Sequence, residues 1–147
     1  MTPTLSGRIQ TRILLLIVIG APWTLLIGPV LPGRPEGASL GDVYEATLAA
    51  LAIVGVGGIA LELIYHGIQQ FRWEKDWPTL FGLLLGVPEG VATFFLLDSG
   101  VIRDVGEVSI PLFITHFATV WVLVWLVANG PARVPFRHWR YRGGRVL

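Results

Sequence analysis

Residues 13–31 read ILLLIVIGAPWTLLIGPVL, a run of 19 residues without a charge. The hydrocarbon core of a bilayer is about 30 Å thick, and a helix needs about 20 mainly apolar residues to cross it. This stretch therefore predicts a membrane-spanning helix. Pro22 lies inside it and lacks the amide hydrogen that would bond the carbonyl of Val18. We expect a kink there, with the Thr24 hydroxyl close to the freed backbone.

Three further stretches, residues 43–64, 80–97 and 110–128, meet the same requirement of length and apolar composition. The segments between them are short, and they leave no room for a soluble domain. The sequence therefore predicts an all-α fold, an integral four-helix transmembrane bundle that forms a single domain over residues 1–147. Residues 129–147 form its basic cytoplasmic tail.

Composition excludes several classes of function. Charged residues make up 14% of the chain, against about 25% in an average soluble domain. The chain contains no cysteine, which excludes disulfide scaffolds, thiolate zinc sites, iron–sulfur clusters and thiol redox catalysis. We expect no cofactor.

The basic residues predict how the spans are oriented. Lys and Arg accumulate on the cytoplasmic side of the spans that they flank. Nine of the 11 basic residues lie before the first span, between the second and third, or after the fourth, and only Arg34 and Arg103 lie on the other side. This pattern predicts a multi-pass plasma-membrane protein with both termini in the cytoplasm. A cleaved signal peptide beginning with Arg8 and Arg12 is the alternative, but the apolar run is long for one and no small-residue cleavage pattern follows closely.

Glu89, in the sequence GVPEG of the third span, is the most informative position. It follows Leu80 by nine residues, which places it about 13 Å along the helix, near the middle of the membrane. An acid there costs roughly 2.5–3.5 kcal/mol, so it must be protonated, paired or facing water. Glu89 is then either a neutral hydrogen-bonded packing residue or a group linked to a proton, an ion or a ligand.

Three glycines around Glu89 are spaced four residues from one another: Gly82, Gly86 and Gly90. Small residues at this spacing let two helices approach closely, so we expect the stripe to form a helix-packing surface. Glu89 and Thr93 project from roughly the same side of the helix. Glu89 is therefore expected to face protein rather than lipid.

His116 in the fourth span is the expected partner of Glu89, because the two lie within about 5 Å of the same depth. Thr119 follows His116 by three residues and shares its helix face. A glutamate–histidine pair in a medium of low dielectric would exchange protons with its surroundings. The alternative is a single imidazole hydrogen-bonded across helices.

Glu62 and His66 are four residues apart at the predicted inner end of the second span, with Tyr65 between them. The pair supplies too few ligands for a closed metal site, so we expect no metal there. Snorkelling of both side chains to the interface explains the pattern. A membrane enzyme acting on a lipid would use the same three residues, but they do not form a recognisable nucleophile–base arrangement.

The tail alternates cationic and aromatic residues and contains Arg137, Arg140 and Arg142. Such a segment beside a membrane suits anionic lipid headgroups, at about 1 kcal/mol per charge, or a protein partner. A plain orientation signal is the simplest alternative. We expect no nucleic acid as a partner, because the tail is short and tethered to the membrane.

Two functional hypotheses follow. In the first, the protein acts by helix association, as a homo-oligomer or as an accessory subunit of a membrane complex. In the alternative, it is a proton- or ion-coupled transporter or channel that uses Glu89 and His116, aided by Thr93 and Thr119. Four helices rarely enclose an aqueous path alone, so the alternative also expects an oligomer.

Overall fold

The computed structural model describes residues 4–71, 79–100 and 108–134, and their regular structure is entirely helical. The elements are α1 (Leu5–Leu15), a π-helical turn η1 (Leu16–Gly20), α2 (Ala21–Ile27), a 3₁₀ turn η2 (Gly28–Val30), α3 (Leu40–Gln70), α4 (Thr79–Leu84), α5 (Gly86–Asp98), α6 (Ile110–Asn129) and a 3₁₀ turn η3 (Pro131–Arg133). The all-α prediction is confirmed over these residues.

Four helical stretches are long and apolar enough to cross a membrane: Leu5–Val30, Leu40–Gln70, Thr79–Asp98 and Ile110–Asn129. The four predicted spans all lie at these places. The first observed stretch begins eight residues before the predicted residue 13, because the helix includes two arginines that the sequence pattern assigned to its flank.

Side chains that accept backbone hydrogen bonds mark the starts of three helices. The Thr4 side chain accepts from the amide of Gly7 at the start of α1. Ser39 and Asp42 form a reciprocal capping box at the start of α3. Ser109 precedes α6, whose second residue is Pro111. These residues satisfy amide groups that would otherwise lack partners at a helix start.

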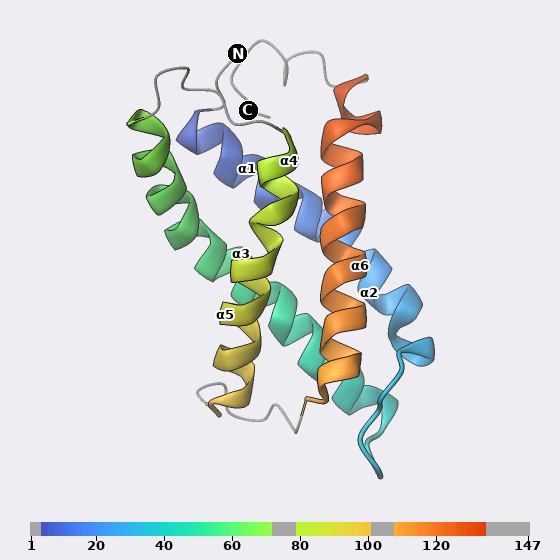
Figure 1. Ribbon diagram of the computed structural model, residues 1–147. Helices are drawn as coiled ribbons and strands as arrows, with labels where there is room; N and C mark the ends of the chain where they lie inside the picture. Colours follow the sequence, from blue (N-terminus) through green and yellow to red (C-terminus); the bar gives the residue numbers. More distant parts are fainter. Residues whose placement is uncertain (1–3, 72–78, 101–107, 135–147) are drawn as a thin grey trace.

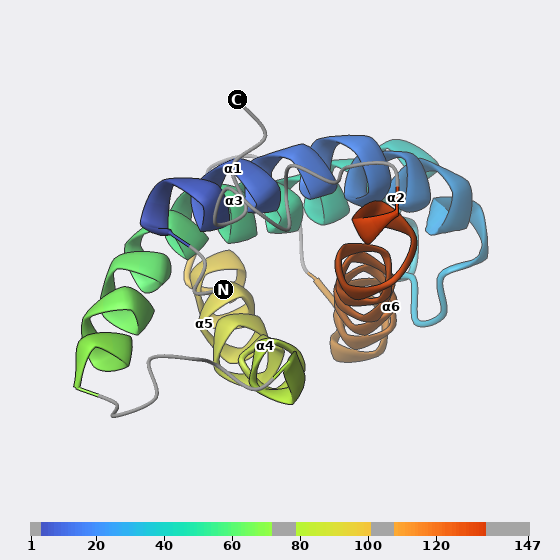
Figure 2. The ribbon, with the colours of Figure 1, turned by 90° about the horizontal axis from the view of Figure 1, so that it is seen from above.

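The helices form two layers (Figures 1 and 2). α1–α2 and α3 run antiparallel in one curved layer, and α4–α5 and α6 stand together on one side of it. α1 begins, α3 ends, α4 begins and α6 ends at the same end of the molecule (Figure 1). We call this the first end of the bundle.

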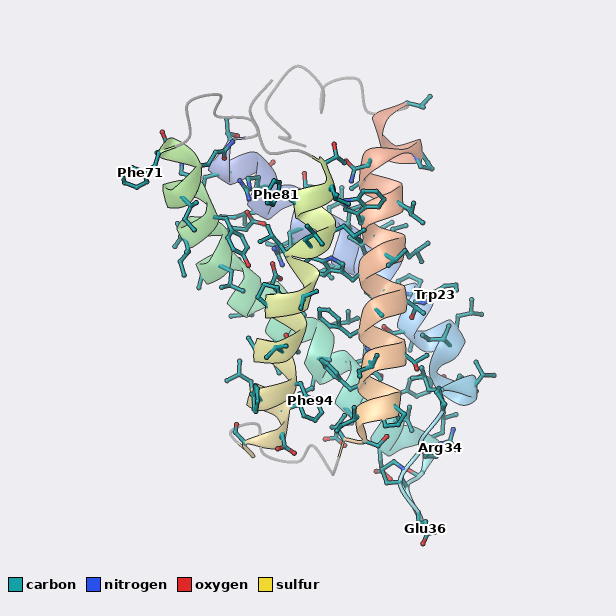
Figure 3. The ribbon with its side chains drawn as sticks, in the orientation of Figure 1. Trp23, Arg34, Glu36, Phe71, Phe81 and Phe94 are labelled. Atoms are coloured by element: carbon teal, nitrogen blue, oxygen red, sulfur yellow. The ribbon has the colours of Figure 1, made fainter. Side chains whose placement is uncertain are left out.

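Apolar side chains cover the outside of the bundle as well as forming part of its core, and several polar side chains are buried with them. Many large aliphatic residues are exposed, whereas the largest fully buried side chains are all polar or charged: His116, Gln69, Glu89, Thr24 and Thr47. Side chains project outward along all the helices in Figure 3, where Phe71 points away from the bundle. This distribution suits a lipid environment, in which apolar surface carries no cost and polar groups need partners inside the protein.

The first span contains the irregularity expected near Pro22, but it takes the form of the π-helical turn η1. The amide of Ala21 bonds the carbonyl of Leu16, five residues back. The Thr24 hydroxyl donates to the carbonyl of Gly20 at 2.8 Å, and not to the Val18 carbonyl that Pro22 leaves without its amide. A proline removes a helical hydrogen bond, and π-turns are a usual way for a helix to absorb such a defect.

The glycine stripe of α4–α5 packs against α6 of the same chain. A Cβ atom added at Gly86 would overlap the indole of Trp121, and one added at Gly90 would lie 2.8 Å from Phe117. Gly82 lies beside Trp125. Stacked rings continue this contact along α6, with 5.7 Å between the ring centres of Phe117 and Trp121. The glycines thus provide the space that the aromatic side chains fill.

We predict that Gly86→Ala destabilises the protein, because the new methyl group would overlap the Trp121 indole. Overpacking of this kind costs about 1–3 kcal/mol. Gly67→Ala is the matched control, since apart from its own stretch of helix no described atom lies within 4 Å of the new methyl group. The control should be neutral or stabilised by up to about 1 kcal/mol. Thermal unfolding in one detergent measures both, and equal stability of the two variants would contradict the packing described.

Candidate functional site

Four charged side chains from three helices form the candidate site, which we call the ion network: Arg8, Arg12, Glu62 and Glu89. The Arg12 guanidinium donates to both carboxylate oxygens of Glu89, at 2.6 Å from Nη1 and 2.9 Å from Nη2. Its Nη2 also donates to Glu62 at 2.9 Å. Arg8 donates through Nε to the other oxygen of Glu62 at 2.6 Å. Glu62 therefore bridges the two arginines, whereas Glu89 contacts Arg12 alone among the described residues.

The sequence spacing explains how the network assembles. Arg8 and Arg12 are four residues apart in α1 and so lie on one face of it. Glu62 lies in α3, and Glu89 lies in α5. α1 packs on α3, and α3 packs on α5. The ion network thus joins three of the four spans.

Gly58 gives the Arg12 side chain room to reach across α3. A Cβ atom at this position would overlap the guanidinium group. On the other side, the guanidinium carbon of Arg12 lies 5.8 Å from the centre of the Trp121 ring, within cation–π range. The Trp121 indole N–H meanwhile donates to the carbonyl of Leu83 at 3.1 Å. Trp121 therefore contacts both the ion network and the backbone next to the break between α4 and α5.

The ion network is largely buried and electrically balanced. The side chains of Arg8, Arg12 and Glu62 are 13%, 11% and 10% exposed, and that of Glu89 is 2% exposed. Two arginines and two glutamates carry no net formal charge. Since an unpaired buried charge is costly, each member depends on the others for its compensation.

Glu89 occupies the middle of its span. It lies ten residues after Thr79 and nine before Asp98, about 15 Å and about 14 Å along the helix. Helix α4 ends at Leu84 and α5 begins at Gly86, two residues before Pro88. The break that Pro88 imposes therefore lies within one turn of the carboxylate.

Two polar side chains of α3 extend the ion network. The Gln69 side chain is 2% exposed and accepts from Nη1 of Arg8 at 3.1 Å. Tyr65 is also buried. Because Glu62, Tyr65 and Gln69 follow one another at intervals of three and four residues, they form one polar face of α3 toward the interior.

His116 belongs to a second polar contact, separate from the ion network. Its Nε2 lies 2.8 Å from the Thr24 hydroxyl of α2. The same hydroxyl lies 2.8 Å from the carbonyl of Gly20, to which it can donate. Nδ1 of His116 is buried with no hydrogen-bond partner among the described residues.

The structure gives Glu89 and His116 different partners. Glu89 pairs with Arg12, and His116 bonds Thr24, so the expected glutamate–histidine pair is replaced by an ion pair and a separate hydrogen bond. Thr93 is buried in α5. Thr119 donates to carbonyl groups of its own helix, at Thr115 and His116.

The three interfacial candidates also separate. Glu62 and Tyr65 turn inward, whereas His66 Nε2 lies 3.3 Å from the Gln70 amide nitrogen. The Glu62 carboxylate is held by two arginines, which leaves it unsuited to the role of a free base in a lipid-acting enzyme. Among the described residues, no group of His, Asp and Glu has the arrangement to hold a metal ion. The tail residues Arg137, Arg140 and Arg142 lie outside the described residues.

Sequence reasoning missed Arg8 and Arg12, because it read them as orientation signals at the edge of the membrane. One signal in the sequence does point to them. Glu62 and Glu89 lie in predicted spans and need countercharges on the side where Arg8 and Arg12, four residues apart, precede the first apolar run. Thr24 was noted for its backbone contact but not as the partner of His116.

No family model, curated protein or solved structure matches this chain. Its function is therefore argued from the ion network and from the placement of the spans.

We predict strong coupling between Arg12 and Glu89 in a double-mutant cycle. Arg12→Met alone leaves the ion network with an excess negative charge, and Glu89→Leu alone leaves an excess positive charge. Each should lower the free energy of unfolding by about 3–5 kcal/mol. The double variant keeps the neutral Arg8–Glu62 pair, so it should lose much less than the two single losses combined.

Thermal unfolding in detergent measures this cycle. Arg34→Met is the control for loss of a cation, because Arg34 is exposed and bonds only the carbonyl of Pro29 among the described residues. It should change stability by no more than about 0.5 kcal/mol. Additive losses in the double variant would show that the Arg12–Glu89 pair does not carry the compensation.

Proposed function

We propose that the chain is a multi-pass protein of the plasma membrane with both termini in the cytoplasm. The distribution of basic residues supports this orientation even when Arg8 and Arg12 are assigned to the ion network. Seven basic residues remain on the side of the first end and two on the other side. The tail arginines 137, 140 and 142 then lie beside the cytoplasmic leaflet, where anionic headgroups would attract them.

The function that the site supports best is proton-linked transport or ion conduction, carried out by an oligomer of this chain. One observation carries the proposal: a carboxylate at the middle of a span, 2% exposed, is held by a single arginine that it shares with a second carboxylate. Ionisable groups at this depth mark proton and ion pathways in membrane proteins. Arg12–Glu89 replaces Glu89–His116 as the pair at the centre of this proposal.

Protonation of Glu89 would change the contacts between helices at the ion network. A neutral carboxyl group no longer compensates Arg12, so Arg12 is left with Glu62, which already serves Arg8. The contact between α1 and α5 then weakens while that between α1 and α3 remains. A proton on Glu89 would thus change how the two layers hold together, as a proton-coupled transporter requires.

Glu89→Gln tests this function in proteoliposomes that report proton movement with an enclosed pH-sensitive dye. We expect the unmodified chain to move protons and Glu89→Gln to show only the background of empty vesicles. Glu45→Gln is the matched control, because it removes an exposed acid outside the ion network. Equal fluxes for Glu89→Gln and the unmodified chain would refute the proposal, and so would an unmodified chain that moves no protons.

Helix association remains the second candidate, either as a homo-oligomer or as an accessory subunit of a membrane complex. The glycine stripe does not support it, since α6 of the same chain fills that surface. An exposed apolar line on α3 does, with Ala52, Val56 and Ala60 at intervals of four, of which the two alanines are small. A surface of this kind suits close contact with another helix.

Native mass in mild detergent tests association. We expect more than one copy of the chain, and we expect Ala60→Leu to lower the share of the oligomer by obstructing the contact. Ala118→Leu, at an exposed position of α6, is the control and should leave the oligomer intact. A monomeric mass for the unmodified chain would contradict association of copies, and co-purified subunits would favour the accessory role.

A further inference from the structure

We infer that Arg12 is an exchangeable binding site for the carboxylate of a small monoanionic acid, which binds together with one proton on Glu89. The inference rests on the proposed function and names its substrate class. The group that the site recognises is a carboxylate, which either a short water-soluble acid or a fatty acid can supply.

Glu89 occupies the place on Arg12 that the carboxylate of a bound ligand would take. Its two oxygens accept from two different nitrogens of one guanidinium group, at 2.6 and 2.9 Å. Paired contacts of this kind are the preferred way in which arginine recognises a free carboxylate. The chain therefore supplies its own carboxylate to the site in the state described.

Glu89 is easier to displace than Glu62. Glu62 accepts from Arg8 and Arg12 together, so its release would leave two cations short of a partner. Release of Glu89 affects Arg12 alone. Arg12 also keeps one donor in reserve, because its Nε is buried and has no hydrogen-bond partner among the described residues.

Charge balance couples the anion to the proton. The resting ion network is neutral. A proton on Glu89 leaves an excess of one positive charge, and an anion without the proton leaves an excess of one negative charge. Both single states place an uncompensated charge inside the membrane and are the less populated ones, whereas one proton with one monoanion restores neutrality. A dianion would leave a negative charge, so the site selects monoanions.

The groups around Glu89 support this balance. α1 presents Arg8 and Arg12, and α3 presents Glu62 and Tyr65. α6 presents the Trp121 ring to Arg12 and carries His116, whose Nε2 is occupied by Thr24. In the binding step no covalent bond to carbon changes. A hydronium ion of the solution gives its proton to a Glu89 oxygen and becomes water, and the incoming carboxylate accepts the hydrogen bonds of the Arg12 N–H groups that Glu89 releases.

Binding to purified protein in detergent tests the inference. Labelled acetate serves as the short acid and labelled decanoate as the fatty acid, and a dye in weak buffer reports proton uptake. We expect the unmodified chain to take up one proton for each anion bound. The acid that saturates at the lower concentration identifies the source of the carboxylate.

Two variants give opposite expected results. Gln at position 89 imitates the protonated acid, so Glu89→Gln should bind the anion without proton uptake, with affinity independent of pH between mildly acidic and mildly alkaline solution. Arg12→Gln should lose affinity by about 100-fold or more, because it removes the cation that the carboxylate contacts. Glu45→Gln and Arg34→Gln are the matched controls and should bind as the unmodified chain does.

Several results would overturn the inference. One is that neither acid binds at any pH, and another is that anions bind without proton uptake by the unmodified chain. A third is that Arg12→Gln, with a native unfolding profile, binds normally. Proton stoichiometry in the unmodified chain decides the matter if a variant fails to fold. Proton flux in vesicles without anion binding would defeat this inference and leave the proposed function standing. Binding of one proton with each anion, without proton flux, would support this inference and defeat the proposed function.

Discussion

The need of a buried arginine for countercharge governs the interior of this protein. Arg12 extends from α1 across the notch at Gly58 and meets carboxylates from two other helices. In water each of these charges would be stable alone, but in an apolar medium each is tolerable only in the presence of the others. The relative positions of α1, α3 and α5 are therefore fixed by a chemical requirement as well as by packing.

Aromatic packing supplies the second constraint, and the two meet at Trp121. Its ring fills the space left by Gly86, lies over the Arg12 guanidinium and bonds the carbonyl of Leu83. A change in the ion network can reach the α4–α5 break through this one side chain. The charged and aromatic parts of the interior thus form a continuous structure between the two layers.

The four long apolar helices were predictable from the sequence, because a helix that crosses a bilayer needs about 20 mainly apolar residues and such runs are visible in the sequence. The irregularity near Pro22 and the depth of Glu89 followed from elementary helix geometry. The partners of the polar groups did not follow, because they depend on the rotation of each helix about its axis. Glu89 and His116 lie at similar depths, yet His116 faces α2 and Glu89 faces α1. The arginines were assigned to the flank because positive residues beside an apolar run usually orient it, and that rule takes no account of acids elsewhere in the chain.

The π-helical turn η1 determines how the side chains of α2 are rotated about the helix axis relative to those of α1. Successive residues of an α-helix are about 100° apart around its axis, and a π-turn accommodates one extra residue. Upstream of η1, the polar side chains of α1 face α3 and α5; downstream, Thr24 of α2 faces α6. In a regular helix, the angle around the axis between the polar side chains of α1 and Thr24 of α2 would be different. One of the two would then no longer face its partners. The inserted residue therefore allows the first span to contact the acids of α3 and α5 through its first half and the imidazole of His116 in α6 through its second half.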